Sequence, residues 1–307
     1  MAKPISRLRG VLRGIGIGLG ALVLLLYLGL PAGLAIVAVF PVRAAVGSRP
    51  EGFEDVVLHT DDGVQLEGWY RPPGNGAVII LLHGAGGSRQ EVRPYAEMLA
   101  AHGYGVLALD LRGHGESQGK TNRLGWQGTL DVGAAVDFLR MRSEVRHIGG
   151  LGISMGGEVL LGAASAYPAI EAMATDGATR RCIEELLALE AERPLVRNFT
   201  ARVMYATVEQ LTGDQPPKPL LQSMTESEQT QFLLIAGGSN ALEVSFNQMF
   251  KAALGNRAAL WIAPGAEHTA AFSRYPQEYE QRLVEFFDRA FRAAAFYGTA
   301  ENRAGGQ

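Results

Sequence analysis

The sequence predicts an α/β protein with a mostly parallel, doubly wound sheet, preceded by a helix that spans a membrane. Near the N-terminus, the residues from Gly14 to Phe40 include no charge. Behind that run, short apolar segments alternate with amphipathic helical segments, as they do in doubly wound sheets. Apolar residues make up 47% of the 307-residue chain and charged residues 19%, so a large core can form.

The composition argues against several classes of protein. The formal net charge is −3, whereas a protein that binds nucleic acid needs cationic side chains to neutralise phosphates, so we expect no nucleic acid partner. Cys182 is the single cysteine, so neither an intramolecular disulfide nor a multi-thiolate metal site can form. Neither a metal-ligand cluster nor a cofactor fingerprint stands out, and we expect no metal and no cofactor.

The charge-free run 14–40 is long enough to cross a bilayer. At about 1.5 Å per residue it reaches roughly 40 Å, and a hydrocarbon core is about 30 Å thick. The apolar part of a cleaved signal peptide is shorter, at about 7–15 residues, and a small-residue cleavage site follows it. We therefore predict a transmembrane helix over 14–40.

The charges that flank this helix predict its orientation. Four basic residues precede it (Lys3, Arg7, Arg9 and Arg13) and two follow it (Arg43 and Arg49). The positive-inside rule places segment 1–13 in the cytoplasm, and the linker 41–51 with everything after it outside the cytoplasm. Gly14, Gly16, Gly18 and Gly20 form two overlapping GxxxG spacings, which could support a homodimer through the membrane helix.

The remainder, 52–298, is predicted to be one domain with eight strands. Asp62-Gly63 marks a hairpin between 56–60 and 64–71, which adds an antiparallel edge to the sheet. The other strands are nearly continuous apolar runs, typical of strands that are buried on both faces. They cover 77–84, 104–113, 147–154, 169–177, 231–238 and 258–265, and the clearest helices cover 91–103, 127–141 and 276–296.

Two segments depart from the strand–helix alternation. The stretch at about 178–230 is too long for an ordinary connection and carries mixed helical signals, so we predict a small helical cap inserted over the sheet. The polar tail 299–307 is expected to be disordered.

The most informative motif is Gly152-Ile153-Ser154-Met155-Gly156, where a strand ends and a helix begins. A nucleophilic serine needs a sharp turn that exposes its oxygen, and flanking glycines permit that turn. His83-Gly84-Ala85-Gly86-Gly87 follows an earlier buried strand. Backbone N–H groups of Ala85 and Met155 would there form an oxyanion hole. Taken alone, the second segment is more typical of a glycine-rich loop with a structural histidine.

His268 is the candidate general base. It lies in the loop after the last strand, on the same sheet edge as Ser154. In open parallel sheets, ligands bind at that edge. A histidine there can take the serine proton and return it to the leaving group.

Over residues 52–295 the chain resembles the α/β-hydrolase superfamily, in particular its single-pass, membrane-anchored serine hydrolases. The resemblance depends on the motifs DDGVQLEGWYRP, LLHGAGGSR, ALDLRGHGES, GISMGG and PGAEHT, in this order. It implies Ser154 as the nucleophile and His268 as the base. The family usually has an aspartate after the strand that matches 232–236, and this chain has Asn240 there, with Glu243 three residues later. Glu243 is the favoured acid because it carries a charge; Asn240 is the alternative, and an incomplete triad the third possibility.

The expected activity is cleavage of a small-molecule acyl substrate, a carboxylic ester or thioester, through an acyl-serine intermediate. Two alternatives stay open: an amidase or peptidase on the same three residues, and a non-catalytic hydrolase-like binding protein.

Overall fold

The structure is a computed structural model that describes residues 4–40, 43–120, 124–189 and 195–304. Its centre is one eight-stranded sheet in the order β1-β2-β4-β3-β5-β6-β7-β8, in which all pairs from β4 to β8 are parallel. The predicted mostly parallel sheet is therefore confirmed. The strands are β1 (Glu54–His59), β2 (Gln65–Arg71), β3 (Ala77–Leu82), β4 (Gly105–Leu109), β5 (His147–Ile153), β6 (Ile170–Asp176), β7 (Gln231–Gly237) and β8 (Ala258–Ala263).

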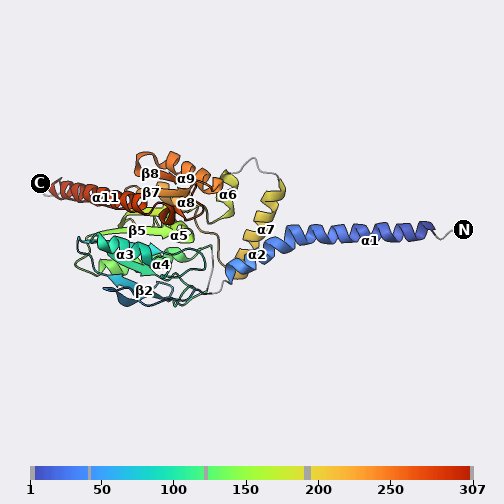
Figure 1. The fold of residues 1–307 in the computed structure, drawn as a ribbon, viewed down its shortest axis with the longest axis horizontal. Coiled ribbons are helices and arrows are strands. Elements are labelled where there is room, and N and C mark those ends of the chain that lie inside the picture. Colours follow the sequence, from blue (N-terminus) through green and yellow to red (C-terminus); the bar gives the residue numbers. More distant parts are fainter. Residues whose placement is uncertain (1–3, 41–42, 121–123, 190–194, 305–307) are drawn as a thin grey trace.

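Helices cover both faces of the sheet and give the domain two cores (Figure 1). Along β3, Val78 and Ile80 pack into one core while Ile79 and Leu81 pack into the other. Successive side chains of a strand point to opposite faces, so a strand covered on both sides must be apolar throughout. One face carries α3 (Arg93–Ala101), α10 (Ala271–Arg274) and α11 (Pro276–Ala304). The other face carries α4 (Gly128–Arg140), α5 (Met155–Gly162), α8 (Leu220–Glu226) and α9 (Ala241–Leu254). A short 3-10 turn, Gly255–Arg257, connects α9 to β8.

The predicted hairpin forms the antiparallel edge of the sheet. β1 and β2 pair from Glu54↔Tyr70 to His59↔Gln65, and β2 also pairs with β4 in the antiparallel sense. The turn requires a positive φ at Gly63, which has φ of 81°.

A long apolar helix projects from the domain (Figure 1). It consists of α1 (Pro4–Leu24), a π-helical stretch (Leu25–Gly29) and α2 (Leu30–Val39). Within the described residues, Leu8–Val39 is one span that is long and apolar enough to cross a membrane. The helix begins ten residues before the predicted start at Gly14, because the basic segment continues it. The first two residues of the predicted linker, 41–42, lie outside the described residues, and 43–50 form neither helix nor strand.

The predicted cap segment divides between two environments. α8 packs on the sheet face beside α5 and α9, so it belongs to the main domain. Only α6 (Ile183–Leu189) and α7 (Leu195–Thr212) stand apart from the sheet, and α7 packs along α2 (Figure 1). Ala35 and Val39 of α2 are buried there with Trp126, Tyr205 and Val208, a group that we name the helix–cap cluster.

The last helix is longer than expected. α11 continues to Ala304, so it extends into the predicted tail 299–307, of which 305–307 lie outside the described residues. Tyr279, Leu283 and Phe287 share one stripe of α11 and are buried against the sheet, which holds the earlier part of the helix in place.

Candidate active site

Ser154 occupies a strained turn between β5 and α5. Its backbone has φ of 51° and ψ of −119°, a conformation that residues other than glycine rarely adopt. The turn brings backbones into close approach: a Cβ on Gly152 would lie 2.4 Å from the Gly156 carbonyl oxygen. A Cβ on Gly156 would lie 2.4 Å from the Leu82 carbonyl oxygen. The two glycines of the motif are therefore required by packing, and the serine is held out at the end of the strand.

His268 lies in the loop after β8 and faces Ser154. The Ser154 hydroxyl donates to His268 Nε2 at 2.9 Å. On the far side of the ring, His268 Nδ1 donates to Glu243 Oε1 at 2.5 Å. The structure thus joins the three residues that the sequence favoured in one hydrogen-bonded chain. The three residues lie in three separate connections of the chain, all at the same edge of the sheet.

Glu243 and Asn240 have different positions in this chain of hydrogen bonds. Glu243 is fully buried in the first turn of α9, and its carboxylate also accepts from the Gly237 N–H at 2.9 Å. Asn240 caps α9 by accepting from the N–H groups of Leu242 and Glu243. Its side-chain amide donates to Glu243 Oε1 at 2.7 Å. Asn240, the alternative acid, therefore contacts Glu243 and orients its carboxylate, while Glu243 is the residue that contacts His268.

The charges around the ring favour the protonated imidazole. The hydrogen bond that His268 donates to Glu243 raises the pKa of His268 above its usual value, and burial of the ring opposes this shift. Asp176, at the end of β6, is a second nearby carboxyl whose charge acts on His268 in the same direction. Burial and the neighbouring Glu243 raise the pKa of Asp176 to about 7. An imidazolium formed at His268 is thus stabilised by a buried anion on its far side.

The predicted oxyanion-hole residues, Ala85 and Met155, lie on the two segments that adjoin Ser154. Met155 is the first residue of α5, and an N–H in the first turn of a helix has no partner within the helix. Gly84 is adjacent to Ser154, since a Cβ on Gly84 would lie 3.6 Å from Ser154 Cβ. Ala85 follows Gly84 in an exposed turn. The Gly84 N–H donates to the carboxylate of Glu91 at 3.1 Å, which fixes the loop that presents Ala85.

His83 is a structural residue. It is fully buried, its Nε2 accepts from the Leu111 N–H at 3.1 Å, and its Nδ1 donates to the Gly84 carbonyl at 2.8 Å. Burial lowers the pKa of His83 to about 3, so the ring is neutral and ties two loops together.

Sequence reasoning missed two carboxyl groups. Asp176 lies within the predicted strand 169–177, although an acidic residue at the C-terminal end of a buried strand is itself a signal for the functional edge. Glu91 lies in the predicted helix 91–103, and no local pattern relates it to Gly84. Within the described ranges, no group of three or more His, Cys, Asp or Glu side chains is placed to hold a metal ion.

A family model described as alpha/beta hydrolase fold matches residues 77–299. This range covers most of the chain and contains Ser154, Glu243 and His268, so the protein belongs to the alpha/beta hydrolase fold family.

Relatives and solved structures agree with this assignment. An uncharacterised protein of Mycobacterium tuberculosis is 35% identical over 133 residues, which cover 42% of this chain and 46% of that protein. A thermostable monoacylglycerol lipase of a Bacillus species is 35% identical over 100 residues, covering 31% of this chain and 38% of the lipase. The chain thus matches less than half the length of each of these two relatives. An esterase structure from Pyrococcus furiosus has a TM-score of 0.66 at 28% identity, covering 82% of this chain and 98% of the esterase.

Proposed function

We propose that the protein is a membrane-tethered serine hydrolase that cleaves a carboxylic ester or thioester through an acyl-serine intermediate. The observation that carries the proposal is the hydrogen-bonded chain from Glu243 through His268 to Ser154, on a strained turn at the functional edge of the sheet. The family match and the named esterase and lipase support a hydrolase.

In the acylation half-reaction, Ser154 Oγ attacks the substrate carbonyl carbon while His268 Nε2 takes the serine proton. The carbonyl oxygen becomes an oxyanion, which the N–H groups of Ala85 and Met155 stabilise. Glu243 stabilises the imidazolium. The tetrahedral intermediate then collapses, the bond to the leaving oxygen or sulfur breaks, and His268 returns its proton to that atom.

Deacylation repeats these steps with water. His268 takes a proton from a water molecule as the water oxygen attacks the acyl carbon. The bond to Ser154 Oγ breaks, the proton returns to Oγ, and a carboxylic acid leaves. The products together contain the atoms of substrate and water, and no redox step is involved.

The helix α1–α2 is the proposed tether. Its apolar span and the excess of basic residues before it support an N-terminus in the cytoplasm and a catalytic domain outside.

The first test uses a fluorophosphonate probe, which labels only an activated serine. We expect the wild-type protein to be labelled and to hydrolyse simple esters, and Ser154→Ala to lose both while it stays folded. A loss of at least 10³-fold is expected, because removing a triad residue typically costs about that much or more. Labelling without ester cleavage would point to an amidase or peptidase, and absence of labelling in the wild type would favour a binding protein.

A further inference from the structure

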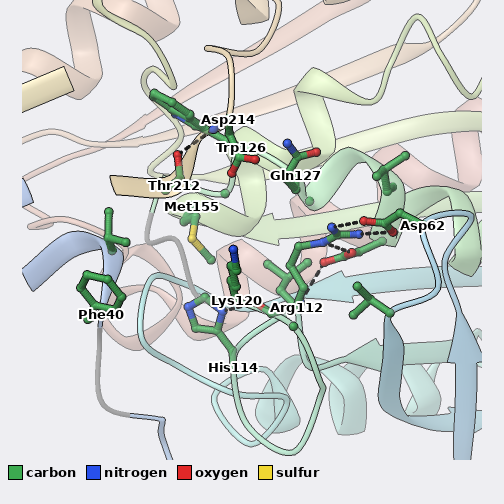
Figure 2. Close-up of a pocket in the computed structure, with 18 of the residues that line it drawn as sticks. Phe40, Asp62, Arg112, His114, Lys120, Trp126, Gln127, Met155, Thr212 and Asp214 are labelled. Carbon is green, nitrogen blue, oxygen red and sulfur yellow. Dashed lines mark hydrogen bonds and ion pairs between the residues drawn. The ribbon is translucent and has the colours of Figure 1, made fainter. Parts of the chain in front are cut away.

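A cavity of about 780 Å³ is lined in part by Met155, the residue that directly follows Ser154 (Figure 2). The volume is within the range of about 300–1,000 Å³ that holds small organic ligands. Ser154 and His268 are not among the lining residues, so the cavity is placed to hold a part of the substrate away from the reacting carbonyl.

The two ends of the cavity differ in chemistry. At one end, Val39 and Phe40 of the long helix and Leu211 of α7 contribute apolar side chains, and the polar Thr212 and Asp214 follow Leu211 in the lining. At the opposite end, Arg112 pairs with Asp62 at 2.8 Å and with Asp131 at 2.7 Å (Figure 2). The positive charge of Arg112 is thereby compensated within the wall.

The packing of α2 on the cap fixes the apolar end relative to a bilayer. Residues of the helix–cap cluster hold the last part of the helix, Pro31–Val39, against α7. The free span, by which we mean the part whose side chains are mostly exposed, runs from about Gly10 to Leu30. It measures roughly 30 Å at 1.5 Å per residue, which matches one hydrocarbon core. A bilayer that covers this part therefore ends beside α7.

Three large apolar side chains of these segments are exposed. Phe40 is 65% exposed, and Phe199 and Leu211 of α7 are 47% and 40% exposed. Large apolar side chains that are exposed beside a membrane helix favour contact with the acyl region of the bilayer. Phe40 and Leu211 also line the cavity, so its apolar end opens at this surface.

We propose that the end of the membrane helix is part of the substrate site, and that the cavity binds the long acyl chain of a lipid ester drawn from the bilayer between Phe40 and Leu211. This inference depends on the proposed function, because it places the ester carbonyl at Ser154. The chain then extends past Met155 towards α2 and α7, and the alcohol part of the lipid lies on the other side of the reacting carbon.

The test compares long and short acyl esters on the full-length protein in phosphatidylcholine vesicles. Leu211→Glu and Phe40→Glu place a carboxylate at the opening, and Leu211→Trp narrows it without a charge. Phe199→Glu is the matched control, because Phe199 is an exposed apolar residue of the same helix that does not line the cavity. For each variant, kcat/KM is measured for a palmitoyl and an acetyl ester, and fluorophosphonate labelling of Ser154 reports a folded site.

We expect the palmitoyl-to-acetyl ratio of kcat/KM to fall by about tenfold or more in the variants at Phe40 and Leu211, since about 1.4 kcal/mol of lost binding corresponds to tenfold. In Phe199→Glu the ratio should stay near that of the wild type. An unchanged ratio in all three variants at the opening, with the wild type active on the acetyl ester, would overturn this inference alone. A wild type that neither hydrolyses the acetyl ester nor reacts with the probe would overturn the proposed function.

A second measurement addresses the route from the bilayer. When the palmitoyl ester is embedded in vesicles, we expect the rate to follow its mole fraction in the membrane. A rate that follows only its bulk concentration at fixed mole fraction would show that the substrate comes from water, and would overturn the proposed route.

Discussion

At the scale of single residues, the acidic position of the site is shared between two side chains. Glu243 supplies the charge that faces His268, and Asn240 supplies a helix cap together with a hydrogen bond to the same carboxylate oxygen. A buried carboxylate is costly unless hydrogen bonds satisfy it, and Glu243 accepts three. The extra methylene of glutamate lets the carboxylate reach the ring from the first turn of α9.

Glu243→Gln should lower kcat by about 10²–10⁴, because the uncharged amide no longer stabilises the imidazolium. The pH dependence should change as well. His268 acts as a base only when it is neutral, and Glu243 raises its pKa, so the acidic limb of kcat/KM in the wild type should lie above pH 6.5, the usual imidazole value. Removing the charge lowers that pKa, and the limb should move to lower pH. The measurement is a pH profile of kcat/KM for both proteins.

Asn240→Ala is the control for this prediction. It removes a cap and one hydrogen bond while it leaves the carboxylate in place, so we expect a smaller loss of kcat and a loss of about 1 kcal/mol in stability. If Asn240→Ala were the more damaging change, or if the acidic limb did not move in Glu243→Gln, Glu243 would not be the acid.

At the scale of elements, the contact between α2 and α7 joins the long apolar helix to the α/β domain. Ala35 and Val39 are nearly inaccessible within the helix–cap cluster, so the last turns of the long helix are part of the folded domain. The same contact positions the wall of the cavity. A boundary placed at the end of the apolar run would therefore cut through a packed interface.

A chain that begins at Gly47 should be less stable than one that begins at Leu30. Losing α2 exposes Trp126, Tyr205 and Val208, and burial of a side chain such as valine contributes about 1.5–3 kcal/mol. For a domain of this size the midpoint of thermal unfolding should fall by about 5 °C. Differential scanning calorimetry in the same detergent measures it.

Two substitutions in the longer chain serve as controls. Val39→Ser, inside the cluster, should reproduce most of the loss, whereas Leu34→Ser, on the exposed side of α2, should not. Equal unfolding midpoints for the chains that begin at Gly47 and Leu30 would mean that the cluster adds nothing to the domain.

At the scale of the whole molecule, the main feature outside the α/β domain is the long apolar helix α1–α2. The helix projects beyond the domain (Figure 1). Its side chains from Leu12 to Leu30 are mostly exposed. Such a surface is stable in a bilayer and strongly unfavourable in water.

The full-length protein should remain in the membrane fraction after a carbonate wash. Arginines introduced together at Leu19 and Leu22, near the centre of the free span, should release it or prevent insertion, because each costs about 2.5–3.5 kcal/mol there. Arginine at Leu8, beside the basic N-terminus, should have little effect. Immunoblotting of the washed fractions measures the distribution, and full-mass wild-type protein in the soluble fraction would contradict the proposed tether.

Orientation can be tested on the same cells. A fluorophosphonate probe that does not cross membranes should label Ser154 in intact cells if the catalytic domain lies outside the cytoplasm. Labelling that appears only after lysis would place the domain on the cytoplasmic side.

The sequence alone determined the class of fold and two of the three residues in the hydrogen-bonded chain. Apolar runs of strand length predict β3 to β8 because both faces of each strand are buried, and that environment leaves a pattern in adjacent residues. The turn around Ser154 also has a local signature, since close backbone contacts at Gly152 and Gly156 exclude any side chain. His268 followed from its place after the last strand.

Tertiary structure decided the features that depend on contacts between distant segments. The choice between Glu243 and Asn240 depends on which side chain reaches a ring 25 residues away, and neighbouring residues do not encode that distance. The division of the predicted cap is similar, because α7 and α8 have comparable local patterns and differ in the partner that buries them. The cavity wall shared by α2, α7 and Met155 joins residues from three distant parts of the chain, so it exists only after the domain has folded.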